Sequence, residues 1–301
     1  MASLKAIRKR ITSTKATQKI TRAMKMVAGA RLTRAQQRIT ALRPYAVKTG
    51  EVLATVAATV NAAAADGALH DLHPLLAKRP EKRIVFLVVT SDRGLCGALN
   101  TNINKLAFRT WHEKVDEGAA NVAFVTAGRK GREFLQRRGG DVVHDFVGIY
   151  EGLDIGKARE IATWLVRRFT REEIDAIYVV YSEFKSAIAQ KATIERLLPL
   201  AAPPPPAEGG AQAPQTQILY EPNEHALLER LVPMYIEITV YRALLENQAS
   251  FYGAQMSAMD AATRNAKELI ARFTLEYNRA RQAGITKELM EIVGGAEALK
   301  E

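Results

Sequence analysis

The turn formed by residues 91–97 (SDRGLCG) holds the residue types that could do chemistry. It follows a continuous apolar run and precedes a helical pattern, which is where doubly wound folds bind phosphate groups. Its glycines, Gly94 and Gly97, give only G-x-x-G and complete neither GxGxxG nor GxxxxGKS/T. The next such turn, residues 128–131 (GRKG), is basic and equally incomplete. We therefore predict two tight strand-to-helix turns in preference to a nucleotide site.

The cysteine and histidine residues give no stronger signal for chemistry. Cys96 is the one cysteine, so no internal disulfide can form and a reducing compartment is expected. Because no Cys-His-Asn arrangement can be assembled around it, we interpret Cys96 as a small buried residue. His70 and His73 have a metal-like spacing but lack a second set of ligands, and we interpret them as surface residues. The sequence thus predicts no catalytic residue, no cofactor and no metal.

Positive charge is concentrated at the start of the chain. Residues 1–50 contain thirteen Lys and Arg residues and no Asp or Glu, whereas the remainder is nearly balanced. Such a segment could bind nucleic acid, act as an organellar transit peptide, meet an acidic protein, or simply form a solvated helix face. The lack of aromatic residues before residue 45 argues against nucleic acid, and the smooth continuation of the helical pattern argues against a transit peptide.

The middle of the chain alternates between strand and helix patterns. Continuous apolar runs such as RIVFLVVT predict buried strands, and residues 190–198 predict an edge strand. Asp154 is the expected N-cap of one helix. Alternation of this kind predicts a Rossmann-like, mostly parallel sheet. The predicted strands span residues 83–90, 121–126, 141–146 and 175–181, and the predicted helices span residues 100–117, 129–138 and 154–170.

Both ends of the chain predict long helices, over residues 3–60 and 223–293, with apolar seams of average spacing 3.5. Each seam needs a partner, so we expect an α/β fold whose terminal helices form an antiparallel coiled-coil rod. We expect Pro44 and Pro233 to kink these helices and the glycines at 294–295 to end the second. The expected domains are residues 1–65, 75–220 and 223–301, with a proline-rich linker insert at 201–216 and a last short strand at 217–220. No apolar run is long enough for a membrane span.

Four stretches match one known family, in order along the chain: residues 17–28 (TQKITRAMKMVA), 90–100 (TSDRGLCGALN), 219–222 (LYEP) and 277–296, which begins YNRARQA and ends IVGGA. Through them the chain resembles the gamma subunit of bacterial rotary F-type ATP synthases. The resemblance implies a non-catalytic central rotor shaft, one copy per complex, which couples proton-driven rotation of the c-subunit ring to conformational change at catalytic sites on the beta subunits. It implies alpha, beta, epsilon and c subunits as partners, and a peripheral location on the cytoplasmic side of the bacterial plasma membrane, without membrane insertion.

The resemblance also implies three groups of contact residues. Met24 and Lys25 would lie near an acidic helix-turn-helix of the beta subunit. A second group on the last helix would contact a beta-subunit loop, and a third would face the c ring and the epsilon subunit at the foot of the shaft. The second group is Arg281, Gln282, Thr286 and Glu288, and the third is Leu219, Tyr220 and Glu221.

Some positions depart from the family pattern. Arg264 stands where relatives often have an aspartate, and Gln255 stands where many have an arginine. The sequence therefore does not predict whether charges pair on this face of the last helix. The proline-rich insert has no cysteine, which excludes the thiol control of plastid relatives. Two other classes remain as alternatives: a basic helical adaptor or nucleic-acid-associated rod with an α/β head, and an α/β enzyme that binds a small ligand.

Overall fold

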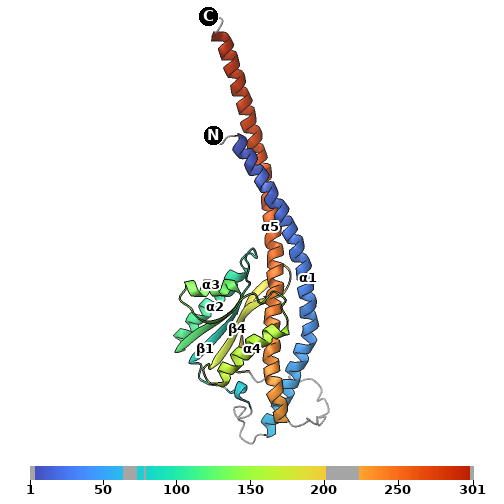
Figure 1. The fold of residues 1–301 in the computed structure, drawn as a ribbon, viewed down its shortest axis with the longest axis vertical. Coiled ribbons are helices and arrows are strands. Elements are labelled where there is room, and N and C mark those ends of the chain that lie inside the picture. Colours follow the sequence, from blue (N-terminus) through green and yellow to red (C-terminus); the bar gives the residue numbers. More distant parts are fainter. Residues whose placement is uncertain (1–3, 64–72, 78, 201–223, 299–301) are drawn as a thin grey trace, which may run out of the picture. The chain divides into compact units, whose positions relative to one another are not determined.

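The computed structural model describes residues 4–63, 73–77, 79–200 and 224–298. It divides into two compact units. We call residues 1–30 with 255–301 the helical unit, and residues 31–254 the sheet unit. Helices α1 (Leu4–Ala63) and α5 (Glu224–Ala298) each contribute residues to both units (Figure 1).

The sheet unit contains a five-stranded sheet with the order β3-β2-β1-β4-β5. The first four strands pair in parallel, and β5 pairs antiparallel with β4, which confirms the predicted mostly parallel sheet. The strands are β1 (Arg83–Val89), β2 (Asn121–Ala127), β3 (Asp141–Phe146), β4 (Ala176–Phe184) and β5 (Gln190–Leu198). The connecting helices are α2 (Leu99–Asp116), α3 (Arg129–Arg137) and α4 (Ile155–Thr170), and a short 3-10 helix, η2 (Pro74–Leu76), precedes β1.

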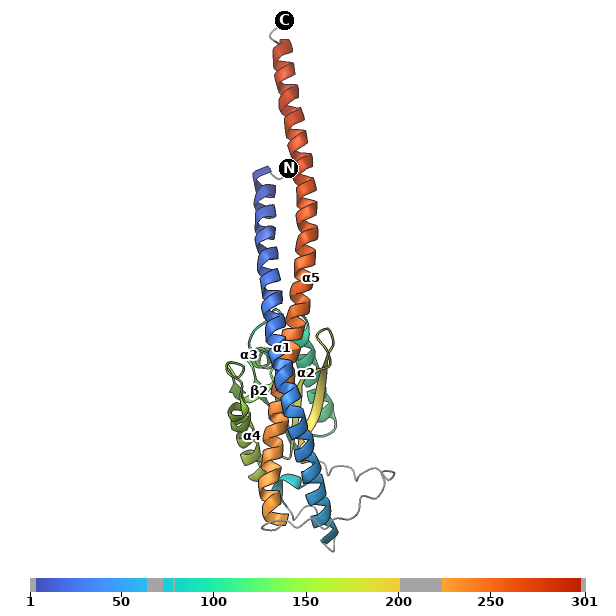
Figure 2. The same ribbon diagram turned by 90° about the vertical axis from the view of Figure 1, so that its right-hand side faces the viewer.

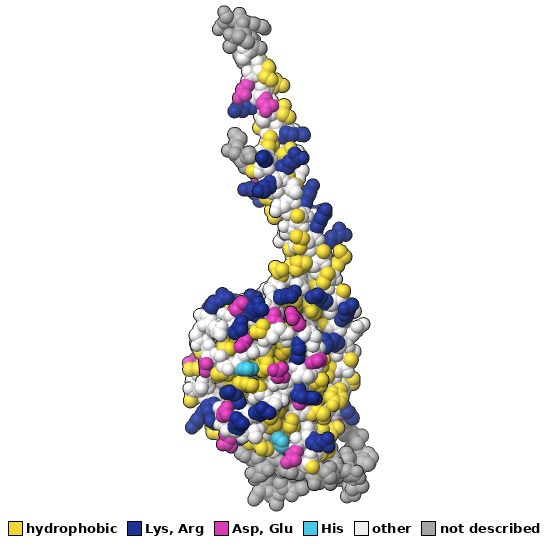
Figure 3. Space-filling model, in the orientation of Figure 1, with side chains coloured by type: hydrophobic (Ala, Val, Ile, Leu, Met, Phe, Trp, Pro, Cys, Tyr) yellow, Lys and Arg dark blue, Asp and Glu magenta, His cyan; other side chains and the backbone are white. Residues whose placement is uncertain are grey.

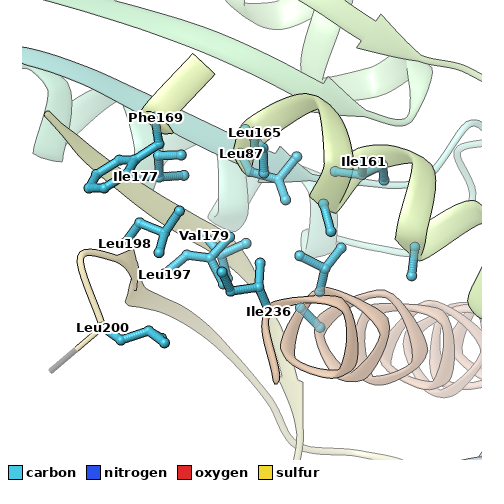
Figure 4. Packing of buried hydrophobic residues seen from close by; sticks show 14 of the residues in the cluster. Leu87, Ile161, Leu165, Phe169, Ile177, Val179, Leu197, Leu198, Leu200 and Ile236 are labelled. Atoms are coloured by element: carbon cyan, nitrogen blue, oxygen red, sulfur yellow. The ribbon is translucent and has the colours of Figure 1, made fainter. Parts of the chain in front are cut away.

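Two hydrophobic clusters cover the two faces of the sheet. Side chains along a strand alternate between faces, so Ile84, Phe86 and Val88 of β1 join one cluster while Val85, Leu87 and Val89 join the other. The first cluster is completed mainly by α2 and α3, and the second by α4, α5, η2 and part of α1. Figure 4 shows the second cluster, in which side chains of α4, of the strands and of α5 meet. Helix α5 is therefore part of the core of the sheet unit.

Helices α1 and α5 run antiparallel within each unit (Figures 1 and 2). In the sheet unit, Arg38 donates to the Tyr241 hydroxyl at 3.1 Å, and the Tyr45 hydroxyl lies 3.4 Å from the sulfur of Met234. In the helical unit, the Thr21 and Thr263 hydroxyls lie 2.8 Å apart. Residue numbers rise along α1 as they fall along α5, which confirms the predicted antiparallel coiled coil.

Pro44 and Pro233 both lie inside continuous helices and break neither one, and the predicted kinks stay predictions. Buried neighbours such as Val232 and Ile236 hold α5 in place there, and this packing outweighs the loss of one backbone hydrogen bond. The expected end of the second helix at residues 294–295 is wrong: α5 continues to Ala298, because glycine in a helix costs only about 1 kcal/mol and does not by itself end it. The predicted strand at 217–220 and the insert at 201–216 lie outside the described residues.

Candidate functional site

The backbone N–H groups at the start of α3 are engaged by the chain itself. Asp92 accepts a hydrogen bond from the Arg129 backbone N–H at 3.0 Å, and the Thr90 hydroxyl accepts one from the Gly131 N–H at 2.8 Å. The Lys130 N–H donates to the Ser91 carbonyl at 3.1 Å. Exposed N–H groups at a helix start are what a bound phosphate requires. Here a carboxylate, a hydroxyl and a carbonyl already occupy those donors.

Gly128 shows what the glycines of these turns do. Its φ is +108°, and a Cβ built on it would lie 2.2 Å from the Thr90 carbonyl oxygen. Only glycine permits this approach of the two neighbouring turns. The turn geometry therefore serves contact between the β1 and β2 turns, in agreement with the prediction of tight strand-to-helix turns.

Cys96 is buried, as predicted, with 2% of its surface exposed. Burial raises the pKa of its thiol and outweighs the hydrogen bonds that would lower it. The Asn100 side chain lies against it, with Nδ2 3.3 Å from the Cys96 sulfur, and also bonds the Ser91 backbone N–H at 3.1 Å. A thiol that stays protonated is a poor nucleophile, so Cys96 acts in packing.

The crevice at the carboxyl ends of β1 and β4 is the switch point of this sheet, where open α/β folds bind ligands. Here α5 packs against the segments beside this crevice. The Ser250 hydroxyl donates to the Ser182 carbonyl at 3.0 Å, and a Cβ on Gly253 would lie 3.1 Å from the Ala187 carbonyl oxygen. Asn247 donates to the Tyr150 hydroxyl at 2.6 Å. Side chains and backbone of α5 therefore form one wall of the place where open α/β folds bind ligands.

Further polar bonds fix α1 and α5 to the rest of the sheet unit. The Arg38 guanidinium of α1 donates to the Leu153 carbonyl as well as to Tyr241. Arg159 of α4 pairs with Glu237 of α5 at 3.0 Å. Arg242 of α5 forms a close ion pair with Glu195 of β5. These bonds tie α1 to the loop before α4, and α5 to α4 and β5.

The helical unit carries the described residues that the sequence analysis assigned to the beta subunit. Arg281, Gln282, Thr286 and Glu288 are all exposed on α5. Met24 and Lys25 lie half-buried on α1, and Lys25 forms an ion pair with Asp260. The sequence analysis missed this pair, although Asp260 is the one acidic residue between positions 247 and 267 and faces a basic helix. The foot residues Leu219, Tyr220 and Glu221 lie outside the described residues.

Metal and membrane signals can be checked over the part of the chain that the structure describes. There, His, Cys, Asp and Glu side chains form no group of three or more that could hold a metal ion. His73 instead caps η2 by accepting from the Leu75 backbone N–H at 3.1 Å. Within the same residues, no helix has an apolar stretch that could cross a bilayer. His70 lies outside the described residues.

These features define a class of protein: an antiparallel coiled coil with a doubly wound α/β domain that packs against its own C-terminal helix. Residues 3–299 match the family described as ATP synthase. The sequence is 53% identical to the ATP synthase gamma chain of Sorangium cellulosum (strain So ce56) and 47% identical to that of Anaeromyxobacter sp. (strain Fw109-5), in both cases over the whole of both chains. The chain belongs to the ATP synthase gamma chain family.

Solved structures share this fold at low sequence identity. A chain from the mitochondrial ATP synthase of Euglena gracilis, in a structure of OSCP, F1 and the c ring, superimposes with a TM-score of 0.64 at 19% identity, covering 98% of this chain and 94% of that one. A chain from the central stalk and c ring of the Tetrahymena thermophila enzyme gives a TM-score of 0.60 at 22% identity, covering 81% and 99%. The fold is therefore retained where most side chains differ.

Proposed function

We propose that this chain is the central rotor shaft of a bacterial rotary ATP synthase. In this role it couples proton-driven rotation of a c-subunit ring to conformational change at catalytic sites on the beta subunits. The full-length match to gamma chains carries the proposal. The polar bonds between α1, α5 and the sheet support it, because a shaft must transmit torque between its helices and its α/β domain without slipping.

The chain itself is non-catalytic in this proposal and takes no cofactor. The engaged N–H groups at the start of α3 and the protonated thiol of Cys96 support that assignment. The alternative of a nucleic-acid-associated rod has less support, since the family match accounts for the basic helix. A single copy would act with alpha, beta, epsilon and c subunits, as a peripheral component on the cytoplasmic side of the plasma membrane.

The exposed end of α5 is where we place the contact with the catalytic ring. Residues 267–293 contain no buried position, yet large apolar side chains such as Ile285, Leu289 and Met290 lie exposed among polar ones. Figure 3 shows Lys and Arg side chains following the helices on the drawn face. An apolar and basic surface of this kind suits an enclosing partner with acidic groups. Arg281, Gln282, Thr286 and Glu288 are the proposed contacts with a beta-subunit loop.

Two further contact groups complete this proposal. Met24 and the Lys25 ammonium, whose side chain is 44% exposed, would face the acidic segment of the beta subunit. The ammonium has three N–H donors, so it can hold Asp260 and still meet a second carboxylate. Leu219, Tyr220 and Glu221 would contact the c ring and the epsilon subunit.

Co-purification tests the proposed function. The tagged full chain should bring down alpha, beta and epsilon subunits, identified by mass spectrometry. Recovery of nucleic acid without these subunits would favour the adaptor alternative and contradict the rotor assignment.

A double substitution tests the proposed contact at the end of α5. Arg281→Ala with Gln282→Ala should weaken assembly with the ring or slow ATP turnover, since truncating a charged hydrogen bond at an interface costs about 2–5 kcal/mol. Both side chains are exposed, so circular dichroism of the free chain should not change. A matched control is Asn102→Ala with Lys105→Ala on the exposed face of α2, which should assemble and turn over normally. Equal behaviour of the two variants would show that the contact residues lie elsewhere.

A further inference from the structure

The helical unit has very little apolar core. Among its described residues, the buried apolar side chains are Ile7, Ala28, Met259 and Ala266, and two of these four are alanines. Alanine buries little area, so the hydrophobic contribution to pairing is small. Segments with few buried contacts open locally at low free-energy cost. Polar contacts between α1 and α5 therefore contribute a larger share of the free energy of helix pairing here than they would beside a large hydrophobic core.

Two threonines form a hydrogen-bonded chain across the helix pair. The Thr263 hydroxyl donates to the Met259 carbonyl of its own helix at 2.7 Å. Its oxygen can then accept from the Thr21 hydroxyl, which lies 2.8 Å away. The one proton of that hydroxyl is shared with the Gln18 carbonyl of its own helix, whose oxygen lies 3.1 Å from the Thr21 oxygen. Thr21 is 8% exposed, so this bond is shielded from water. The bond joins α1 to α5 at a position where the seam would otherwise hold an apolar side chain.

An ion pair lies one turn along from the threonines. The Lys25 ammonium of α1 contacts the Asp260 carboxylate of α5, and Arg264 lies 3.4 Å from the other oxygen of that carboxylate. The hydrogen bond from Lys25 holds the pKa of Asp260 below its ordinary value, and both cations add to this effect. The carboxylate is thus ionised at neutral pH and shared by two cations from the two helices.

The sequence makes these contacts specific to one register. A Cβ on Gly29 would lie 3.5 Å from the sulfur of Met256, one turn beyond the ion pair, so the three contacts follow a single antiparallel alignment. A shift of four residues in one direction would bring Lys25 opposite Arg264, where two positive charges repel. Alanine contacts discriminate poorly between such alignments, whereas a polar residue in a seam fixes the register.

We propose that Thr21, Lys25, Asp260 and Thr263 form a polar latch that fixes the register of α1 on α5 in the helical unit. Lys25 is then a positioning residue within the chain, in addition to any contact that it makes with a partner. If a carboxylate of a partner formed an ion pair with Lys25 in place of Asp260, the Lys25–Asp260 contact of the latch would be lost. The proposal concerns the free chain and is independent of the rotor assignment.

Hydrogen exchange of the full-length chain tests the latch. In Lys25→Glu, amides of residues 4–24 should exchange about three to ten times faster than in the wild type, because an attraction becomes a repulsion. The swapped double variant, Lys25→Glu with Asp260→Lys, should restore part of the slow exchange, because the new lysine pairs with the new glutamate but lies near Arg264. Lys25→Met, which removes only the charge, should give a smaller acceleration. Amides of β1 should keep their wild-type rates in every variant.

The control is Lys19→Glu, which makes the same charge change at an exposed position of the same helix and should leave exchange unchanged. Raising the salt concentration to about 1 M, where the screening length falls to about 3 Å, should narrow the difference between Lys25→Glu and the wild type. The latch is excluded if neither Lys25 variant accelerates exchange, if the swapped double variant exchanges as fast as Lys25→Glu alone, or if Lys19→Glu accelerates exchange as much as Lys25→Glu.

Discussion

Helix α5 has two different environments along its length. In the sheet unit, its residues Ile236, Val240 and Leu244 are completely buried in the cluster that covers one face of the sheet. In the helical unit, no residue from 267 to 293 is buried. The apolar seam has similar spacing in both stretches, so periodicity predicts a helix equally well in each. Burial depends instead on which other elements of the chain are present to cover the seam.

This difference also separates two kinds of stabilisation. The sheet unit is held by large side chains on both faces of a sheet, with polar bonds added at its edges. The helical unit relies on a thin seam and a few partly exposed polar bonds. A given substitution should therefore have a large effect in the first unit and a small one in the second, and matched pairs of variants can test this expectation directly.

The largest difference is expected for a charge placed at buried alanines of α5. Ala249 in the sheet unit is 0% exposed, and Ala266 in the helical unit is 5% exposed. Ala249→Asp should leave the sheet unit largely unfolded, because an unpaired buried carboxylate costs several kcal/mol against a total stability of about 5–15 kcal/mol. Ala266→Asp should retain a cooperative melt of the sheet unit in circular dichroism, because the new carboxylate can turn toward water. Loss of that melt in both variants would mean that the two units unfold as one.

A smaller difference between the two units is expected when a carboxylate that pairs with a cation is replaced in each of them. Asp175 is 4% exposed and accepts hydrogen bonds from the Arg83 guanidinium at 2.6 and 3.1 Å and from the Arg83 backbone N–H at 2.8 Å. Burial alone would raise the pKa of Asp175, but these bonds outweigh it and leave the pKa below its ordinary value. Asp175→Asn should cost about 2 kcal/mol at pH 7, and Asp260→Asn should leave the unfolding midpoint of the sheet unit unchanged.

The pH dependence of Asp175→Asn follows from the sign of that shift. A carboxyl whose pKa is lowered by folding stabilises the folded state above its unfolded pKa, and this stabilisation is lost as the pH falls through the folded pKa. The stability difference between wild type and Asp175→Asn, measured by urea unfolding, should thus be constant near neutral pH and shrink below about pH 4. A difference that stayed constant down to about pH 2 would mean that Asp175 is not the group responsible.

Much of the fold follows from local patterns. The strand of residues 83–90 is predicted to within one residue, because a short continuous apolar run is typical of a strand covered on both faces. Asp154 is predicted as an N-cap, and its side chain does accept from the Lys157 backbone N–H at 3.0 Å. The alternating pattern of residues 190–198 likewise predicts the edge strand β5. In each case the signal lies within a few neighbouring residues.

Contacts between distant residues could not be predicted in this way. The capping of α3 by Thr90 and Asp92 requires that two turns lie side by side, and no local pattern specifies that placement. The Lys25–Asp260 pair depends in the same way on the register of two helices that are far apart in sequence. The partner contacts of Arg281 and Gln282 stay predictions from resemblance, since they depend on other subunits.

The smallest difference is expected for two threonines that each make a hydrogen bond across elements. Thr90 is 0% exposed, and its hydroxyl accepts from the Gly131 N–H at 2.8 Å. Thr90→Val keeps the shape but leaves that buried N–H without an acceptor, which should cost about 1–3 kcal/mol in urea unfolding of the sheet unit. Thr21→Val should leave that unfolding within about 0.5 kcal/mol of the wild type, since Thr263 keeps its bond to the Met259 carbonyl and valine suits the seam. Equal shifts for the two variants would show that the thin seam contributes to the stability of the sheet unit as much as a buried cap does.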